Sequence, residues 1–143
     1  MLIEVKTKTT RKINNKSITK TENFVVPDCE LFVEAEHTVM NHLSEEQTSG
    51  LVENFQIQAI KISGLNEVCT QYQGDYSYIA TLQDTFMDDN GNEKPLNYKV
   101  LLFANDLAEA MDNARNLAHQ GYNMVIIGLK EVNYEYLIVT NNE

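Results

Sequence analysis

One strand-to-helix motif occurs twice in this chain and restricts the folds that it can adopt. The first copy runs from Phe24 to Glu36 and the second from Tyr98 to Met111. In each copy a β-branched or aromatic run leads to an Asp or Asn that can cap a helix, and an apolar-x-Glu-Ala sequence opens that helix. The two openings are Phe32-Val33-Glu34-Ala35 and Leu107-Ala108-Glu109-Ala110. A motif repeated at this spacing predicts an internal duplication.

The residues around each motif predict the same order of elements. In the first half, strands over residues 3–10 and 17–26 flank an Asn14-Asn15 turn, a helix covers 29–44, a polar loop covers 44–54, and a strand covers 55–63. In the second half, strands over 76–86 and 96–103 flank a turn at 89–92, a helix runs from Asp106 to a stop at Gly121, and strands follow at 123–130 and 134–139. The sequence therefore predicts an α+β fold, a duplicated ββαβ unit with one or two antiparallel sheets covered by two helices.

About seventy residues are marginal for independent folding, so we expect one domain over residues 1–143, built from repeats 1–63 and 76–140 that share a core. Asp28 is the expected cap of the first helix, and Asp106 with Glu109 forms the expected capping box of the second. The helical spacing predicts six buried side chains: Phe32, Val39, Leu43, Leu107, Met111 and Leu117.

Charge is distributed unevenly along the chain. The whole sequence has 11 basic and 21 acidic residues, a net charge of −10. Residues 1–21 contain one acid, Glu4, and six bases, so this segment is +5 and the remainder is −15. The six bases are Lys6, Lys8, Arg11, Lys12, Lys16 and Lys20. The equivalent hairpin of the second half is acidic instead, with Asp84, Asp88, Asp89 and Glu93 against Lys94.

The predicted register of the first hairpin separates two faces. Ile3 and Val5 lie opposite Val26 and Phe24, but the pairs Thr7–Glu22, Thr9–Lys20 and Arg11–Ile18 are too polar to bury, so we expect the distal half to project into water. The opposite face carries Lys6, Lys8 and Lys12 among Ser, Thr and Asn residues. Such a face can neutralise phosphates, and the alternative interpretation is a solvated edge strand whose lysines prevent aggregation.

Signals for catalysis and for bound cofactors are weak. Cys29 and Cys69 lack metal-ligand spacing, and His37 and His42 are five residues apart, so they lie on different sides of a helix. The glycines form no phosphate-binding loop, and no Ser or Cys stands in a nucleophile motif. We expect no enzyme, no cofactor and no metal. Some of the seven tyrosines can stack on unpaired bases, although core packing and strand propensity explain most of them.

Location and membrane association are also addressed by the sequence. The chain has no apolar run long enough to span a bilayer and no secretory leader, so we expect a cytoplasmic protein with no membrane partner.

The paired motifs resemble an uncharacterised family of small proteins, a domain of unknown function found in Bacteroidetes and their phages, including crAss-like phages. The resemblance rests on Phe24-Val25-Val26 with Phe32 to Glu36, on the strand from Ile57 to Ile62, and on Glu109-Ala110. Pro27 and the loop over residues 44–54 depart from the pattern. The resemblance implies a phage or bacterial accessory protein and transfers no catalytic or binding residue.

The leading hypothesis is a non-enzymatic phage accessory protein, in the host cytoplasm, that binds single-stranded nucleic acid through its basic hairpin. One alternative is a protein-interaction or assembly module, including one that counters a host defence protein, with the acidic surface as the contact and homo-oligomers as one outcome. A small-molecule-binding domain between the repeats is a third.

Overall fold

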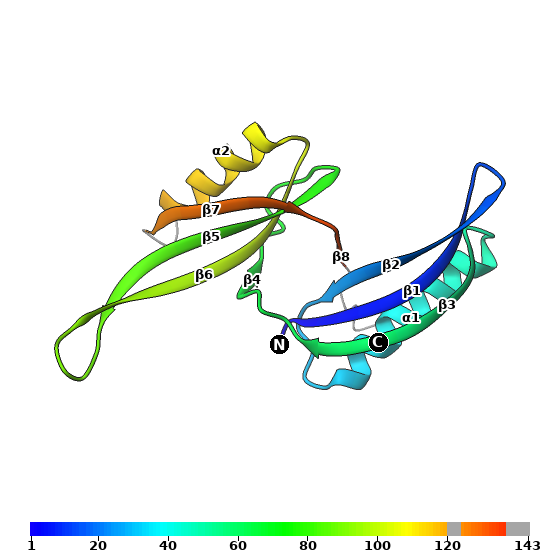
Figure 1. Ribbon diagram of the computed structural model, residues 1–143, viewed down its shortest axis with the longest axis horizontal. Helices are drawn as coiled ribbons and strands as arrows, with labels where there is room; N and C mark the ends of the chain where they lie inside the picture. The colour runs from blue at the N-terminus through cyan, green and yellow to red at the C-terminus, as the bar shows by residue number, and fades with distance from the viewer. Residues whose placement is uncertain (120–123, 137–143) are drawn as a thin grey trace. The chain divides into compact units, whose positions relative to one another are not determined.

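The computed structural model describes residues 1–119 and 124–136, and the chain divides into two compact units. Unit 1 comprises residues 1–63 together with the chain from Tyr134, and unit 2 comprises Gly64–Asn133. Each unit holds a four-stranded sheet with one helix, so the α+β class is confirmed (Figure 1). The stop predicted at Gly121, and the end of the last strand near Val139, lie outside the described residues.

Unit 1 has the sheet order β3-β1-β2-β8. Its strands are β1 (Ile3–Ile13), β2 (Lys16–Val26), β3 (Val52–Ile62) and β8 (Tyr134–Tyr136), and its helix is α1 (Phe32–Thr48). The β1–β2 register is the predicted one, with Ile3 opposite Val26 and Arg11 opposite Ile18. Asn14 and Asn15 both take positive φ, 51° and 64°, which is the geometry of a two-residue hairpin turn.

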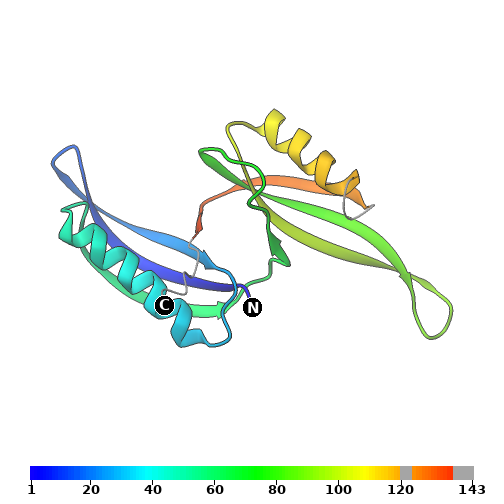
Figure 2. The ribbon, with the colours of Figure 1, turned by 180° about the vertical axis from the view of Figure 1, so that it is seen from behind.

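Helix α1 differs from its prediction at both ends. Asp28 was expected to cap the helix, but it takes φ 58° in the preceding turn, and the N-cap is Leu31 without a side-chain hydrogen bond. The expected loop over residues 44–54 is wrong, because the helix continues to Thr48 and β3 already begins at Val52. The added turn lets α1 run along most of the sheet (Figure 2).

Unit 2 has the sheet order β4-β6-β5-β7. Its strands are β4 (Glu67–Val68), β5 (Tyr76–Met87), β6 (Glu93–Ala104) and β7 (Val125–Val132), and its helix is α2 (Leu107–Leu117). The predicted cap of α2 is confirmed, because the Asp106 side chain accepts a hydrogen bond from the backbone N–H of Glu109 at 2.8 Å. Gly91, with φ 79°, provides the positive φ in the β5–β6 turn.

Each sheet has a short edge strand that directly follows, in the chain, the last strand of the other sheet's ββαβ series. β4 follows β3 in the chain but pairs in parallel with β6, with Val68 opposite Leu101. β8 follows β7 but pairs in parallel with β2, with Asn23 opposite Tyr134. The element order is thus ββαβ in each half, followed by a strand that joins the other unit. The duplication itself, and a single domain over residues 1–143, stay predictions.

Each unit has its own cluster of buried apolar side chains between helix and sheet. In unit 1, Ala35, Val39 and Leu43 of α1 pack on strand residues such as Phe24. In unit 2, Ala110, Ala114 and Leu117 of α2 do the same on β5 and β6.

The predicted core list is partly right. Val39, Leu43 and Leu117 are buried and Met111 is half-buried, but Phe32 and Leu107 are 47% and 57% exposed. Both exposed residues stand at the first position of their helices. Side chains there point back toward the helix N-terminus, so Phe32 and Leu107 escape the contact that the alanine three residues later makes with the sheet.

Candidate nucleic-acid interface

The face of the first sheet that α1 leaves uncovered carries a row of lysines. Lys6, Lys8 and Lys12 stand at alternate positions of β1, and all three are exposed. Because β1 lies between β2 and β3, this row runs along the middle of the face rather than along an edge. Same-face residues of a strand repeat about every 6.8 Å, so Lys6 and Lys8 present two positive charges at short, regular spacing.

Neutral polar side chains flank the lysine row on both sides. On β2, Asn23, Thr21 and Ser17 lie opposite Lys6, Lys8 and Lys12. On β3, Gln56 lies opposite Lys8, and Asn54 lies opposite Thr10. Thr10 and Thr19 share a hydrogen bond of 2.8 Å between their hydroxyl groups across the β1–β2 pair. These flanking side chains offer donors and acceptors and carry no charge themselves.

Carboxylates occur at the two ends of this face, and both have partners. At one end the Glu4 carboxylate, 9% exposed by residue, accepts a hydrogen bond from Ser63 Oγ at 2.9 Å and lies 3.5 Å from Lys61 Nζ. Burial, the Glu4 charge and a hydrogen bond to Glu4 raise the pKa of Tyr134. At the other end Glu53 accepts from Ser17 Oγ at 2.6 Å. Within the described residues, no carboxylate pairs with Lys6, Lys8 or Lys12.

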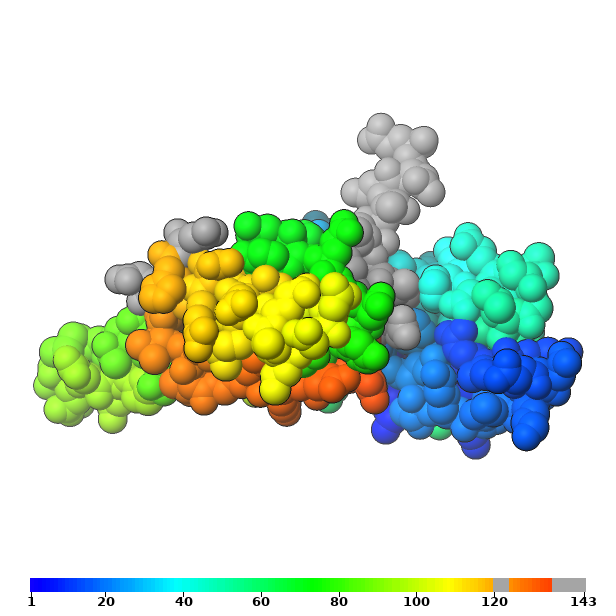
Figure 3. Space-filling model, turned by 90° about the horizontal axis from the view of Figure 1, so that it is seen from above, coloured from blue at the N-terminus to red at the C-terminus, as the bar shows by residue number. Residues whose placement is uncertain are grey.

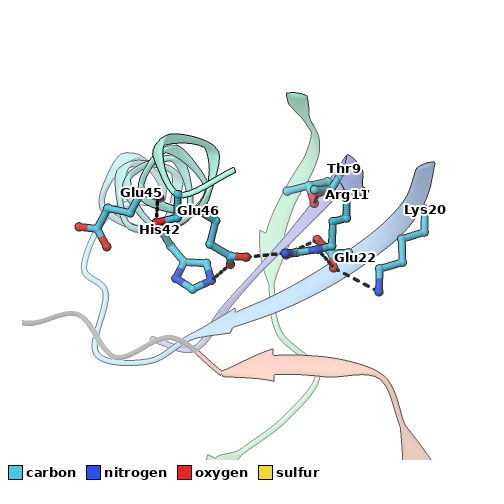
Figure 4. A network of polar contacts seen from close by, with 9 residues as sticks. Thr9, Arg11, Lys20, Glu22, His42, Glu45 and Glu46 are labelled. Carbon is cyan, nitrogen blue, oxygen red and sulfur yellow. Dashed lines mark hydrogen bonds and ion pairs between the residues drawn. The ribbon is translucent and has the colours of Figure 1, made fainter. Parts of the chain in front are cut away.

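Arg11 lies on the opposite face, under α1, and is held by two carboxylates (Figure 4). Its Nε and Nη2 donate to the Glu22 carboxylate at 2.8 and 2.9 Å, and its Nη1 donates to Glu46. The hydrogen bonds that Arg11 donates to Glu22 and Glu46 raise its pKa despite its partial burial. A guanidinium committed in this way has few donors left for a phosphate.

The remaining two basic residues occupy different environments. Lys20 Nζ lies 3.6 Å from the Glu22 carboxylate on the α1 side of the sheet. Lys16 is exposed beside the hairpin turn. The structure therefore brings together Lys6, Lys8 and Lys12, places Lys16 at their distal end, and separates Arg11 and Lys20 from them.

The polar layer under α1 overturns the expectation that the distal hairpin projects bare into water. Thr7 and Thr9 are fully buried and hydrogen-bond each other at 2.8 Å, and Glu22 is 7% exposed. Burial alone would raise the pKa of Glu22, but its hydrogen bonds and charge interaction with Arg11 lower it overall. The layer is buried because the longer α1 brings Glu46 above Arg11, so each buried charge has a partner.

Among the described histidines and tyrosines, His42, Tyr78 and Tyr98 are engaged within their own units. His42 Nε2 lies 2.6 Å from Glu46, and its ring meets Phe24 edge-on with a centroid distance of 6.0 Å. Tyr78 is buried in unit 2, and the Tyr98 hydroxyl donates to Glu67 at 3.1 Å. Across residues 1–119 and 124–136, no three His, Cys, Asp or Glu side chains are placed to hold a metal ion, and no helix is long and apolar enough to cross a membrane.

The sequence analysis missed two further lysines in unit 2. Lys99 of β6 and Lys130 of β7 border a hollow of about 350 Å³ on the sheet face away from α2, with Ile79, Thr81 and Gly128 between them. Gly128 leaves this space open, since the nearest side-chain atom to a Cβ built there is 3.8 Å away. The period-two alternation of each strand could have shown which face Lys99 and Lys130 occupy. It could not show that β7 pairs with β5, which brings the two lysines to the same hollow.

Comparison with known proteins gives one match. The model of the family described as Domain of unknown function (DUF4494) matches residues 1–138. No curated protein and no solved structure matches the chain.

Proposed function

Because this chain belongs to the DUF4494 family, whose description names no activity, we propose its function from the lysine row: non-enzymatic binding of single-stranded nucleic acid. The observation that supports the proposal most is that Lys6, Lys8 and Lys12 lie in line on the sheet face that α1 leaves uncovered, without carboxylate partners among the described residues, in a chain of net charge −10. An acidic protein that keeps such a row has a local attraction for a polyanion despite its total charge.

The flanking side chains favour contact with the nucleic-acid backbone over reading of bases. Thr21, Asn23 and Gln56 are short or neutral groups that hydrogen-bond phosphates and sugars. A sheet face that is open along its length suits an extended single strand, whose phosphates can follow a line of lysines. The proposal includes the phage or bacterial setting that the family resemblance implies, and a cytoplasmic location.

A salt titration tests the proposal. Fluorescence polarisation with a labelled oligothymidine should show binding that weakens as salt rises, with Lys6→Gln/Lys8→Gln lowering the slope of log K against log[salt] by about 1.4, or about 0.7 for each contact. The matched control is Lys94→Gln/Arg115→Gln, which removes the same charge from unit 2 and should leave the slope unchanged. Equal slopes in both variants would remove the row from the site, and no binding at low salt would refute the function.

A further inference from the structure

The β5–β6 hairpin extends beyond α2 (Figure 3). Large apolar side chains near the end of this hairpin are exposed. Phe86, Met87 and Leu96 are 47%, 62% and 48% exposed. Phe86 lies opposite Lys94, and Leu96 lies opposite Asp84. Phe86 and Leu96 lie on the same face of the hairpin as diagonal neighbours, and Met87 lies on the other face. Exposed apolar side chains grouped in this way form a patch that marks a protein contact.

Helix length explains why this patch is uncovered. In unit 1 the 17-residue α1 reaches Arg11, in the distal half of β1, and the layer beneath it is polar and fully partnered. In unit 2 the buried cluster that includes residues of the 11-residue α2 contains Tyr78, Ala80 and Leu82 of β5. Beyond Leu82, β5 continues through Gln83, Asp84 and Thr85 to Phe86 and Met87, so two large apolar residues end the strand where α2 does not cover it.

The patch has an acidic border. Asp84, Asp88, Asp89 and Glu93 surround it, and Lys94 is the one base among them, so residues 84–96 carry a charge of −3. Asp88 also organises the turn, since its Oδ1 accepts from the backbone N–H groups of Asn90 and Asn92 at 2.9 Å each. We name Asp84–Leu96 the acidic tip.

The complementary surface is present on the same chain. Near the end of the β1–β2 hairpin, Ile18, opposite Arg11, and Ile13, opposite Lys16, are each 42% exposed. Lys16 is exposed on the same face as these two isoleucines, and Lys12 is exposed on the other face of the hairpin. We name Lys12–Ile18 the basic tip. Apolar side chains bordered by lysines in one tip match apolar side chains bordered by carboxylates in the other.

We propose that the acidic tip of one molecule binds the basic tip of a second copy. The contact is heterologous, because the two surfaces differ, so it closes into a two-fold dimer when both pairs engage or continues into rings or filaments. Two hairpin ends bury less area than a stable dimer interface, so the association is weak, and its charged border makes it sensitive to salt. The inference does not depend on nucleic-acid binding, although Lys12 serves both contacts.

Sedimentation velocity of nuclease-treated protein, over a concentration series, tests this contact without nucleic acid. Wild type should gain mass with concentration at low salt and lose that gain at high salt. Phe86→Ser/Leu96→Ser and Lys12→Glu/Lys16→Glu should each stay monomeric. The matched control is Val125→Ser, which removes an apolar side chain that is 69% exposed outside the tip, and it should associate like wild type.

Mixing the two tip variants provides the decisive measurement. The Phe86→Ser/Leu96→Ser chain keeps an intact basic tip, and the Lys12→Glu/Lys16→Glu chain keeps an intact acidic tip. Their mixture should therefore form a one-to-one heterodimer that neither forms alone and that grows no further. A mixture that stays monomeric, a wild type that is monomeric at every concentration, or tip variants that associate like wild type would each overturn the proposal. Far-ultraviolet circular dichroism of the variants confirms that they are folded.

Discussion

Arg11 of β1 binds the Glu22 carboxylate of β2 through two hydrogen bonds, Nε to Oε2 at 2.8 Å and Nη2 to Oε1 at 2.9 Å. The fork-to-carboxylate geometry fixes both side chains beneath α1, and Glu46 of the helix receives a third guanidinium N–H. One residue thus joins two strands and a helix, which ties the length of α1 to the burial of the polar layer.

Removing Arg11 should destabilise unit 1 more than removing the pair. Arg11→Met leaves the buried Glu22 carboxylate without its main partner, and we expect a loss of about 3 to 5 kcal/mol in the free energy of unfolding. Arg11→Met/Glu22→Leu should recover most of that loss, because no buried charge remains. Urea denaturation measures the free energy of unfolding of both variants. A double variant that is less stable than Arg11→Met would contradict the role of Arg11 as the partner of a buried charge.

Acid should weaken the fold through Glu22. Its pKa in the folded protein lies below the ordinary value of 4.5, so ionised Glu22 stabilises the fold above about pH 4.5, and that contribution is lost as pH falls through the lowered pKa. Glu22→Gln should flatten the decline of stability with acid, whereas Glu45→Gln, at an exposed position of α1, should keep the wild-type slope. Melting temperatures measured across the acid range test this expectation. Parallel curves of melting temperature against pH for wild type and Glu22→Gln would refute the role assigned to Glu22.

Leu43→Ala and Phe32→Ala should have very different effects, although the sequence pattern predicted both residues to be buried. Leu43 is fully enclosed, so its truncation should cost about 2 to 5 kcal/mol. Phe32 is 47% exposed, and its truncation should cost clearly less. Chemical denaturation of the two variants checks this difference, and a larger loss for Phe32→Ala would show that the observed helix face is wrong.

Gly74→Ala should disturb the start of β5. A Cβ at Gly74 would lie 2.2 Å from the carbonyl carbon of Ala104, which is backbone and cannot rotate away. We expect a loss of about 1 to 3 kcal/mol, as for other overpacked sites. Gly64→Ala is the control, because nothing lies within 4 Å of its Cβ, and it should be close to neutral. Equal melting temperatures for the two variants would contradict the close approach.

The sequence by itself determined the local parts of this protein. Alternation predicted the β1–β2 register from Ile3 to Arg11, and paired asparagines predicted the turn, because both depend on neighbouring residues. The same alternation placed Lys6, Lys8 and Lys12 on one face. The capping interaction of Asp106 is equally local, since it spans three residues.

The tertiary structure alone decided what each face meets. Thr7, Thr9 and Glu22 look too polar to bury until Arg11 is seen to contact Glu46, 35 residues away, across the helix–sheet interface. The same contact withdraws Arg11 from the phosphate-binding set that its charge suggested. β4 spans two residues, too few for a periodic signal, and β8 lies within the predicted strand over 134–139, but its place beside β2 depends on the tertiary structure. Burial and pairing between distant segments depend on the path of the whole chain, and no local window of sequence contains that path.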